Sequence, residues 1–388
     1  MTVEFGLALE NFTPETKKPD MDAVSAYAVT AEELGFASVW AWDHLFLGAR
    51  RPFPFLEALT TLSMVAARTS QIMVGTGVLV LPIREPAILA KAVGTLQLGS
   101  GGRVMLGVAS GWYEREFHAT AVPFGERGEI FERNLDMLYR LWDDDDVSGQ
   151  WDGRTLTHVR MLPRPEPRPQ VLIGGYVNRV LRRAATRSDG WLTYFYTAAS
   201  IASAWSRIRG YAQEAGRDPD GLNLVAQVPL CIGASYEEAT RRAREYVDDY
   251  FDVPAWSEAT PESAVRGTPE QCAEQIAAYA DAGVKHLVFC PYNYEAEQVQ
   301  RLAAEVLPLL GSRILRASVG AELWSTSRCW RPGPSGRPPH GPRWTSGQRP
   351  RRRRRLSATA ITSRSAGPCI RAPPWRWCSR FCGSARGT

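Results

Sequence analysis

The sequence lacks the cysteine patterns that mark disulfide-rich or metal-binding proteins. Only three of its seven cysteines, Cys231, Cys272 and Cys290, precede residue 321, and none of them lies in a CxxC pair or at metal-ligand spacing. Such scattered thiols are typical of reduced, buried cysteines. No stretch resembles a signal peptide or an apolar run of about 18 residues. We therefore expect a cytoplasmic protein with no membrane-spanning segment and no bound metal.

Positive charge is scarce everywhere except at the C-terminal end. The net charge is +5, but residues 321–388 hold 15 arginines, no lysine and one acid, which leaves 31 basic and 40 acidic residues in 1–320. The larger part of the chain is therefore acidic. Any affinity for a polyanion such as nucleic acid belongs to the C-terminal tail.

The C-terminal tail also lacks a periodic apolar face. It contains RRRRR at 351–355 and many Pro, Gly and Ser residues, a composition typical of disorder. An arginine tract can bind nucleic acid or an anionic membrane. Five scattered tryptophans favour an inert extension or sequence read in a shifted frame over a functional basic arm. We predict a folded domain at 1–316 and a disordered Arg/Pro-rich tail at 317–388.

The most informative stretch, residues 72–112, predicts a strand, a helix and a second strand. Residues 72–81 are almost continuously apolar and rich in Val and Leu, as in a strand buried on both faces. Pro86 can begin the helix, the glycines at 99–102 can end it, and residues 104–109 form the next buried strand. This β-α-β unit predicts a parallel sheet.

The same alternation continues on both sides of the unit and predicts a closed barrel. Further strands are expected at 3–9, 37–42, 171–173, 191–194, 222–232 and 286–290, with helices at 24–34, 56–68, 127–142, 179–186, 200–215, 271–282 and 299–309. Eight strands, each followed by a helix, indicate an α/β protein with a (β/α)8 barrel. Residues 143–168 are expected to form an insertion at the rim of the barrel, folded as a hairpin. Residues 252–267 are expected to form a second insertion, which could act as a lid.

Several motifs resemble those of the bacterial luciferase-like family of flavin and deazaflavin oxidoreductases. They are GTGVLVLP (75–82), REPAILAK (84–91) and SGGRVMLGVASGW (100–112), with AEELGFASVWAWDH (31–44), PQVLIGG (169–175), SDGW (188–191) and GTPEQCAEQIAAYADAGVKHLV (267–288) in the expected order. The resemblance covers about residues 3–310. It implies a (β/α)8 barrel that binds coenzyme F-420 or FMN.

The active site of such a barrel lies at the carboxyl ends of its strands. The residues there are Asp43, His44, Gly77, Val78, Gly111, Trp112, Gly174, Gly175, Tyr194, Tyr196, Pro291 and Tyr292. His44 follows an acid at a strand end, where an imidazole can act as acid or base near neutral pH. It could equally be a rim histidine that bonds a loop, and Asp43 could be a loop cap. The resemblance implies that His44 lies near the reactive ring face and that Asp43 helps to hold the ring.

Glycines within strand 72–81 indicate either a bulge or tight packing against another group. The resemblance implies a bulge with a non-prolyl cis peptide, which we assign to Gly77-Val78, supporting the cofactor ring from behind. Gly174-Gly175 precedes a helix whose N-terminal N–H groups could face a phosphate, although any strand-to-helix turn needs small residues. The G-x-G-x-x-G pattern of a dedicated dinucleotide domain is absent.

Trp112 could be an aromatic wall of the pocket or part of the core. Sugar-phosphate dehydrogenases of this family carry a catalytic Glu at that position, so Trp112, with Glu114 two residues on, argues against a sugar-phosphate substrate. Arg84 and Arg115 could meet a cofactor tail or be solvated. The resemblance implies hydride transfer between F-420 and a small organic substrate, with His44 catalytic, Tyr194 among the cofactor contacts and a homodimeric assembly. An FMN-dependent monooxygenase that uses O2 is the alternative, and polyanion binding through the tail is a remote one.

Overall fold

Eight parallel strands form the centre of the computed structural model, which describes residues 2–14, 16–48, 52–251 and 260–311. The strands are β1 (Glu4–Ala8), β2 (Ser38–Ala41), β3 (Met73–Val80), β4 (Val104–Ala109), β7 (Gln170–Gly174), β8 (Gly190–Tyr194), β9 (Asn223–Ile232) and β11 (His286–Pro291). They pair in the order β9-β11-β1-β2-β3-β4-β7-β8, and β8 pairs with β9 again. The sheet therefore closes on itself, as predicted.

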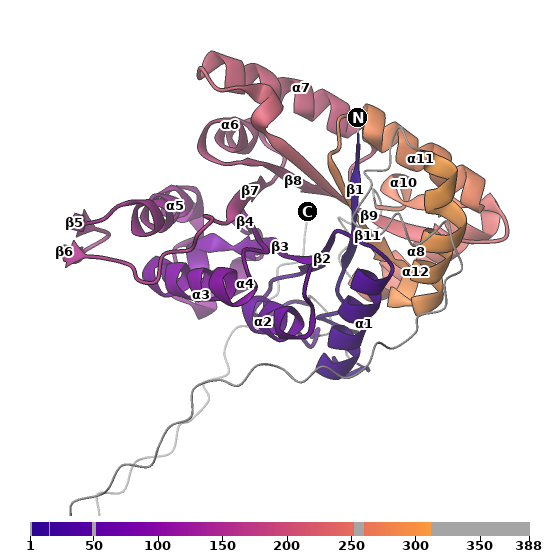
Figure 1. Cartoon of the computed structure of the whole chain (residues 1–388), viewed down its shortest axis with the longest axis horizontal. Coiled ribbons are helices and arrows are strands. Elements are labelled where there is room, and N and C mark those ends of the chain that lie inside the picture. Colours follow the sequence, from indigo (N-terminus) through magenta and orange to yellow (C-terminus); the bar gives the residue numbers. More distant parts are fainter. Residues whose placement is uncertain (1, 15, 49–51, 252–259, 312–388) are drawn as a thin grey trace, which may run out of the picture. The chain divides into compact units, whose positions relative to one another are not determined.

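Helices surround the strands (Figure 1). They are α1 (Met21–Glu33), α2 (Ala58–Arg68), α3 (Pro86–Gly99), α4 (Glu114–Ala119), α5 (Arg127–Asp143), α6 (Asn178–Arg187), α7 (Ala198–Glu214), α8 (Tyr236–Phe251), α10 (Thr260–Ser263), α11 (Pro269–Asp281) and α12 (Ala296–Arg301). Local sequence explains several of their starts. Pro86 is the first residue of α3, and Thr268 and Gln271 form a reciprocal capping box at the start of α11.

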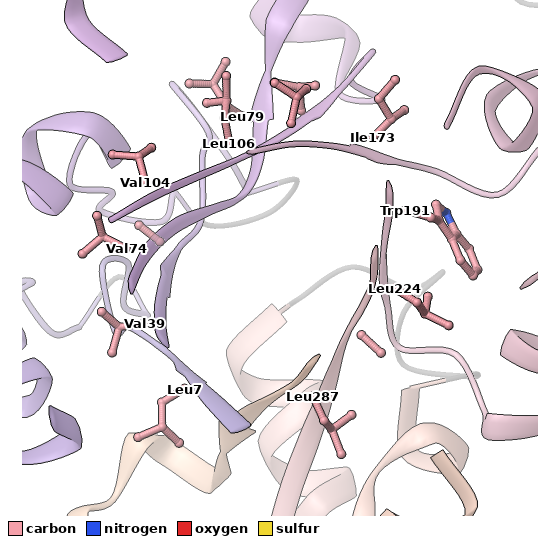
Figure 2. Packing of buried hydrophobic residues seen from close by; sticks show 14 of the residues in the cluster. Leu7, Val39, Val74, Leu79, Val104, Leu106, Ile173, Trp191, Leu224 and Leu287 are labelled. Carbon is pink, nitrogen blue, oxygen red and sulfur yellow. The ribbon is translucent and has the colours of Figure 1, made fainter. Parts of the chain in front are cut away.

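Side chains alternate between the two faces of the barrel wall. Figure 2 shows residues such as Val39, Leu106 and Trp191 pointing away from the ring of strands, toward the helices. Their neighbours Trp40 and Met105 belong instead to a separate cluster of buried residues on the other face of the strands. Because both faces are covered, the strands are almost continuously apolar, which is why their sequence pattern is easy to recognise.

The N-terminal end of the barrel contains a buried polar chain. Trp40 Nε1 donates to Ser38 Oγ at 2.6 Å, and Ser38 Oγ lies 2.5 Å from His286 Nε2. His286 Nδ1 lies 3.4 Å from a carboxylate oxygen of Glu4. Gly6 has no room for a Cβ, which would lie 2.2 Å from Ser38 Oγ. Polar contacts therefore fill the end of the barrel opposite the predicted site.

The predicted hairpin is confirmed. Strands β5 (Val147–Trp151) and β6 (Arg154–Val159) pair antiparallel within the insertion 143–168 and extend beyond α5 and α3 (Figure 1). The insertion joins a helix to the next strand, so it lies at the N-terminal rim. It does not border the strand ends where the candidate site lies.

Residues 236–251 form helix α8, which the sequence pattern did not predict. Among residues 236–246, whose side chains are described, the buried ones are Ala239, Ala243 and Tyr246. Two alanines give a weak apolar signal, which explains the omission. The proposed lid at 252–267 is only partly described, and its described end contains β10 (Val265–Gly267), which pairs with β9. The predicted disordered tail at 317–388 lies outside the described residues.

Candidate active site

The strand-end residues predicted from the sequence lie together at the carboxyl end of the barrel. Asp43 Oδ2 accepts from the Val80 N–H at 2.9 Å, which links the ends of β2 and β3. A Cβ on Gly174 would lie 2.9 Å from Val78 Cγ1, so the ends of β3 and β7 are in contact. The ring of Trp112, just after β4, lies 5.7 Å from that of His44. Four strand ends therefore contribute to one site.

His44 is held by a carboxylate that sequence reasoning missed. Its Nδ1 lies 3.0 Å from Glu116 Oε2, and the other carboxylate oxygen accepts from the backbone N–H groups of Leu45 at 2.5 Å and Phe46 at 3.2 Å. Glu116 is fully buried on α4. The glutamate singled out from the sequence, Glu114, is exposed and lies 3.6 Å from His118 instead. Neighbouring residues of a helix point in different directions, so the apolar Phe117 next to Glu116 did not reveal that Glu116 is buried.

Three aromatic rings surround the imidazole of His44. Phe55, Trp112 and Tyr113 lie edge-on to it, with ring centroids 5.6, 5.7 and 6.4 Å away. Trp112 is 40% exposed, so it is an accessible side chain beside His44 and not part of the core. This exposure excludes the core alternative, and the role of Trp112 as an aromatic wall of a pocket stays a prediction. His44 therefore lies in a largely apolar environment next to accessible space.

Asp43 is a buried acid with strong partners. Its Oδ1 lies 2.5 Å from Arg84, which also lies 3.4 Å from Glu57. Burial raises the pKa of the Asp43 carboxyl above its ordinary value, and Arg84 and the Val80 N–H offset part of that increase. Arg84 thus forms ion pairs with two carboxylates. These contacts favour a structural role for Arg84, holding Asp43 in place, over contact with a cofactor tail.

The predicted bulge and cis peptide in β3 are confirmed. The register between β3 and β4 shifts between Thr76 and Leu79, and the Gly77-Val78 peptide is cis. A Cβ on Gly77 would lie 2.1 Å from Nε2 of Gln227, a residue of β9 on the opposite side of the barrel. Gln227 is 1% exposed, and its Oε1 has no hydrogen-bond partner in the described structure. Sequence reasoning did not identify Gln227, because a single polar residue in an apolar strand carries no positional signal.

Gly174 and Gly175 lead from β7 toward the N-terminus of α6. A Cβ on Gly175, whose φ is +131°, would lie 2.9 Å from Val180, so only glycine is readily accommodated. No described side chain caps the first turn of α6. The Val180 N–H donates to the Val177 carbonyl at 2.8 Å, so the N–H groups before Val180 are the ones that can face an anion. Trp191 Nε1 donates to the Gly175 carbonyl at 2.8 Å and so fixes the turn.

Tyr194 ends the neighbouring strand β8. Its ring lies 5.3 Å from that of Tyr176, whose hydroxyl donates to the Tyr194 carbonyl at 2.6 Å. Burial raises the pKa of both phenols, so both stay protonated at neutral pH. Tyr194 therefore lies at a strand end, as predicted, next to Tyr176, and its contact with a cofactor stays a prediction.

The fold and this site define a barrel enzyme of the kind that works at the carboxyl ends of its strands. Residues 3–286 match the luciferase-like monooxygenase family, and the chain belongs to that family.

Curated relatives include F-420-dependent glucose-6-phosphate dehydrogenases, of which two illustrate the similarity. The enzyme from Amycolatopsis mediterranei is 27% identical over 73% of this chain and 93% of its own length. The enzyme from Nakamurella multipartita is 28% identical over 76% of this chain and 92% of its own length.

Solved structures with the same fold include an F-420-dependent secondary alcohol dehydrogenase in complex with an F-420–acetone adduct. Its TM-score is 0.67 at 19% identity, covering 80% of this chain and 99% of that one. The oxygenating component of 3,6-diketocamphane monooxygenase from Pseudomonas putida, in complex with FMN, has a TM-score of 0.67 at 18% identity, covering 81% and 99%.

Proposed function

We propose that this protein is an oxidoreductase that transfers a hydride between coenzyme F-420 and a small organic substrate. The observation that carries the proposal is the likeness to F-420-dependent dehydrogenases over more than nine-tenths of their length, together with an imidazole held at the carboxyl end of the barrel. When bound, the deazaflavin would supply the hydride chemistry.

The residues of the site fit such a cofactor. The side-chain amide of Gln227 faces the β3 bulge at Gly77 with Nε2 nearest to it, and its Oε1 is a buried acceptor without a partner in the described structure. We propose that Gly77-Val78 supports the ring, that Asp43 and Tyr194 help to hold it, and that Trp112 forms a side wall. The backbone N–H groups at Gly174-Gly175 and at the start of α6 would donate hydrogen bonds to the phosphate.

His44 would then exchange the proton that accompanies hydride transfer. Its Nδ1 is occupied by Glu116, so Nε2 is the nitrogen available to a substrate oxygen. The surrounding rings of Phe55, Trp112 and Tyr113 would limit the access of water to that proton.

The substrate we propose is not a sugar phosphate, despite the names of the relatives. Trp112 occupies the position where the resemblance places a catalytic Glu, and it presents an accessible aromatic surface. Arg84, close to the site, already pairs with Asp43 and Glu57. An uncharged organic substrate suits this surface better than a phosphate ester.

An FMN-dependent monooxygenase remains the second candidate. It is supported by the family to which the chain belongs and by a fold shared with an FMN complex. FMN also carries a phosphate, so the same glycine turn would serve it, and Gln227 could face either ring.

We propose that the chain acts as a homodimer in the cytoplasm. A groove between α2 and α3 is lined by small side chains such as Ser63 and Ala92, while Met64 and Ile88 are 43% and 71% exposed nearby. An Ile88→Glu variant should lower the molar mass measured by light scattering from that of a dimer to that of a monomer.

Three buried, unpaired cysteines suit a reducing compartment, and no described helix is both long and apolar enough to cross a membrane.

The proposal can be tested by an anaerobic assay of alcohols, aldehydes and ketones that follows the F-420 chromophore. A His44→Asn variant should lose roughly 100-fold or more of the turnover while still binding F-420. His118→Asn, at an exposed histidine, is the matched control and should keep full activity. Turnover that depends only on FMN and O2 would support the monooxygenase instead, and an active His44→Asn enzyme would refute the assigned role.

A further inference from the structure

We infer that Glu116 is a positioning residue that fixes the tautomer and orientation of His44, with the proton on Nδ1 and Nε2 as a bare acceptor. The inference about the imidazole depends only on the geometry of the chain. Its consequence for catalysis rests on the function proposed above.

Each carboxylate oxygen of Glu116 has a hydrogen-bond partner. Oε1 receives the N–H groups of Leu45 and Phe46, and Oε2 lies 3.0 Å from His44 Nδ1. An ionised carboxylate has no proton to donate, so the contact at Oε2 needs a proton on Nδ1. In a neutral imidazole the other nitrogen, Nε2, is then unprotonated.

Glu116 is itself fixed in place, which a positioning residue requires. It is fully buried on α4, and the Thr120 hydroxyl donates to its backbone carbonyl at 2.8 Å. The next residue, Phe117, is also fully buried and lies 5.1 Å, edge-on, from the ring of Phe124. The carboxylate therefore cannot move away without unpacking this turn.

The same carboxylate ties the loop after β2 to the turn after β4. Its bonds to Leu45 and Phe46 hold the backbone immediately after His44, so that both the ring and its attachment are fixed. The hydrogen bond that the described residues make to the His44 ring is the one at Nδ1, with Glu116. The acceptor nitrogen is thus free for a substrate or cofactor.

A glutamine at 116 cannot reproduce this arrangement. A carboxylate accepts on two oxygens, whereas an amide accepts on one and donates from the other. In Glu116→Gln, the side-chain NH2 group must therefore point either at His44 Nδ1–H or at the two backbone N–H groups. In both orientations two hydrogen-bond donors face each other. Glu114→Gln, two residues earlier and exposed, is the matched control.

The first test is nitrogen-15 NMR of the histidine rings in the full chain, without cofactor and in alkaline buffer. We expect His44 to show a protonated Nδ1 and a bare Nε2, and Glu116→Gln to lose that pattern while Glu114→Gln keeps it. A proton on Nε2 in the wild-type protein, with or without one on Nδ1, would overturn the inference. The wild-type spectrum decides the matter even if Glu116→Gln does not fold.

The second test concerns catalysis. Glu116→Gln should lower kcat roughly 10- to 100-fold and leave F-420 affinity nearly unchanged, as expected when an outer partner orients a catalytic group. Unchanged kcat in a folded Glu116→Gln enzyme would contradict the positioning role. If the wild-type protein shows the expected tautomer but no turnover with F-420, the proposed function fails and the inference about the imidazole stands.

Discussion

At the scale of single residues, Asp43 is a buried acid whose stability depends on its ion pair with Arg84. It is 4% exposed, and its charge is balanced by Arg84 and by one backbone N–H. Removing one partner of a buried ion pair leaves the other charge poorly compensated, and Arg84 would keep only Glu57, 3.4 Å away. We therefore expect Asp43→Asn to lower the free energy of unfolding in urea by about 3 kcal/mol.

The matched control for this change is an exposed ion pair. Asp22 and Arg68 lie 3.1 Å apart, with side chains 83% and 54% exposed. Asp22→Asn should change the free energy of unfolding by only about 0.5 kcal/mol. Equal effects of the two substitutions would contradict the view that burial makes the Asp43 pair important.

Prediction from the sequence reached some site residues and not others for a physical reason. Asp43 and His44 were found because they directly follow a recognisable strand, and strand ends meet at one face of a barrel. Glu116 and Gln227 reach the site from a short helix and from the opposite barrel wall. Their positions depend on how distant segments pack, which no local pattern encodes.

At the scale of secondary-structure elements, Glu32 joins the end of α1 to the start of β3. Its carboxylate accepts from the N–H groups of Ser70, Gln71 and Ile72 and from the Ser70 hydroxyl. Burial alone would raise the pKa of Glu32, but these hydrogen bonds together lower it below its ordinary value. The folded state therefore favours the ionised form.

The sign of this shift predicts a pH dependence. A lowered pKa stabilises the fold above the ordinary pKa of about 4.3, and this stabilisation is lost as pH falls through the folded-state value. At pH 7 Glu32→Gln should cost about 1 kcal/mol in urea unfolding, and the difference from wild type should shrink below about pH 4. Glu33→Gln, at the exposed neighbouring residue, should show no such trend. A difference between Glu32→Gln and wild type that stays constant with pH would contradict the stabilising role of the Glu32 carboxylate.

Strands β3 and β9 are coupled across the barrel through Gly77 and Gln227. A methyl group on Gly77 would lie 2.1 Å from Gln227 Nε2, so Gly77→Ala should cost about 1 to 3 kcal/mol of unfolding free energy. In a Gln227→Ala background the same change should cost about 1 kcal/mol less. Gly99→Ala, with nothing within 4 Å of the new methyl group, should combine additively with Gln227→Ala. Additive effects for Gly77 would show that the two residues do not meet.

Elements differed in how well the sequence predicted them. Strands such as β3 and β4 are buried on both faces, so hydrophobicity alone identifies them. In helix α8 the buried side chains among residues 236–246 include two small ones, Ala239 and Ala243, and the many charged residues of this helix hide its apolar period. Elements that present little apolar surface to the core are the ones that hydrophobic patterning misses.

For the whole molecule, we propose that residues 1–316 carry the fold and the activity. The family match ends at residue 286, and the described fold ends with buried side chains at Val306 and Leu310. Deleting 317–388 should leave the melting temperature and F-420 affinity unchanged and should remove any binding to DNA in a gel-shift assay. Deleting from residue 302 onward is the control and should destabilise the protein, since it removes Val306 and Leu310. If deleting only residues 317–388 abolished F-420 binding, part of the function would lie in the tail.

The central claim is that this luciferase-like barrel binds a deazaflavin at the carboxyl ends of its strands. The most direct measurement is a parallel titration of the full chain with F-420 and with FMN, following the chromophore of each. We predict saturable binding of one F-420 per chain at concentrations where FMN remains free. Saturation by FMN with F-420 left unbound, or binding of neither, would contradict the claim.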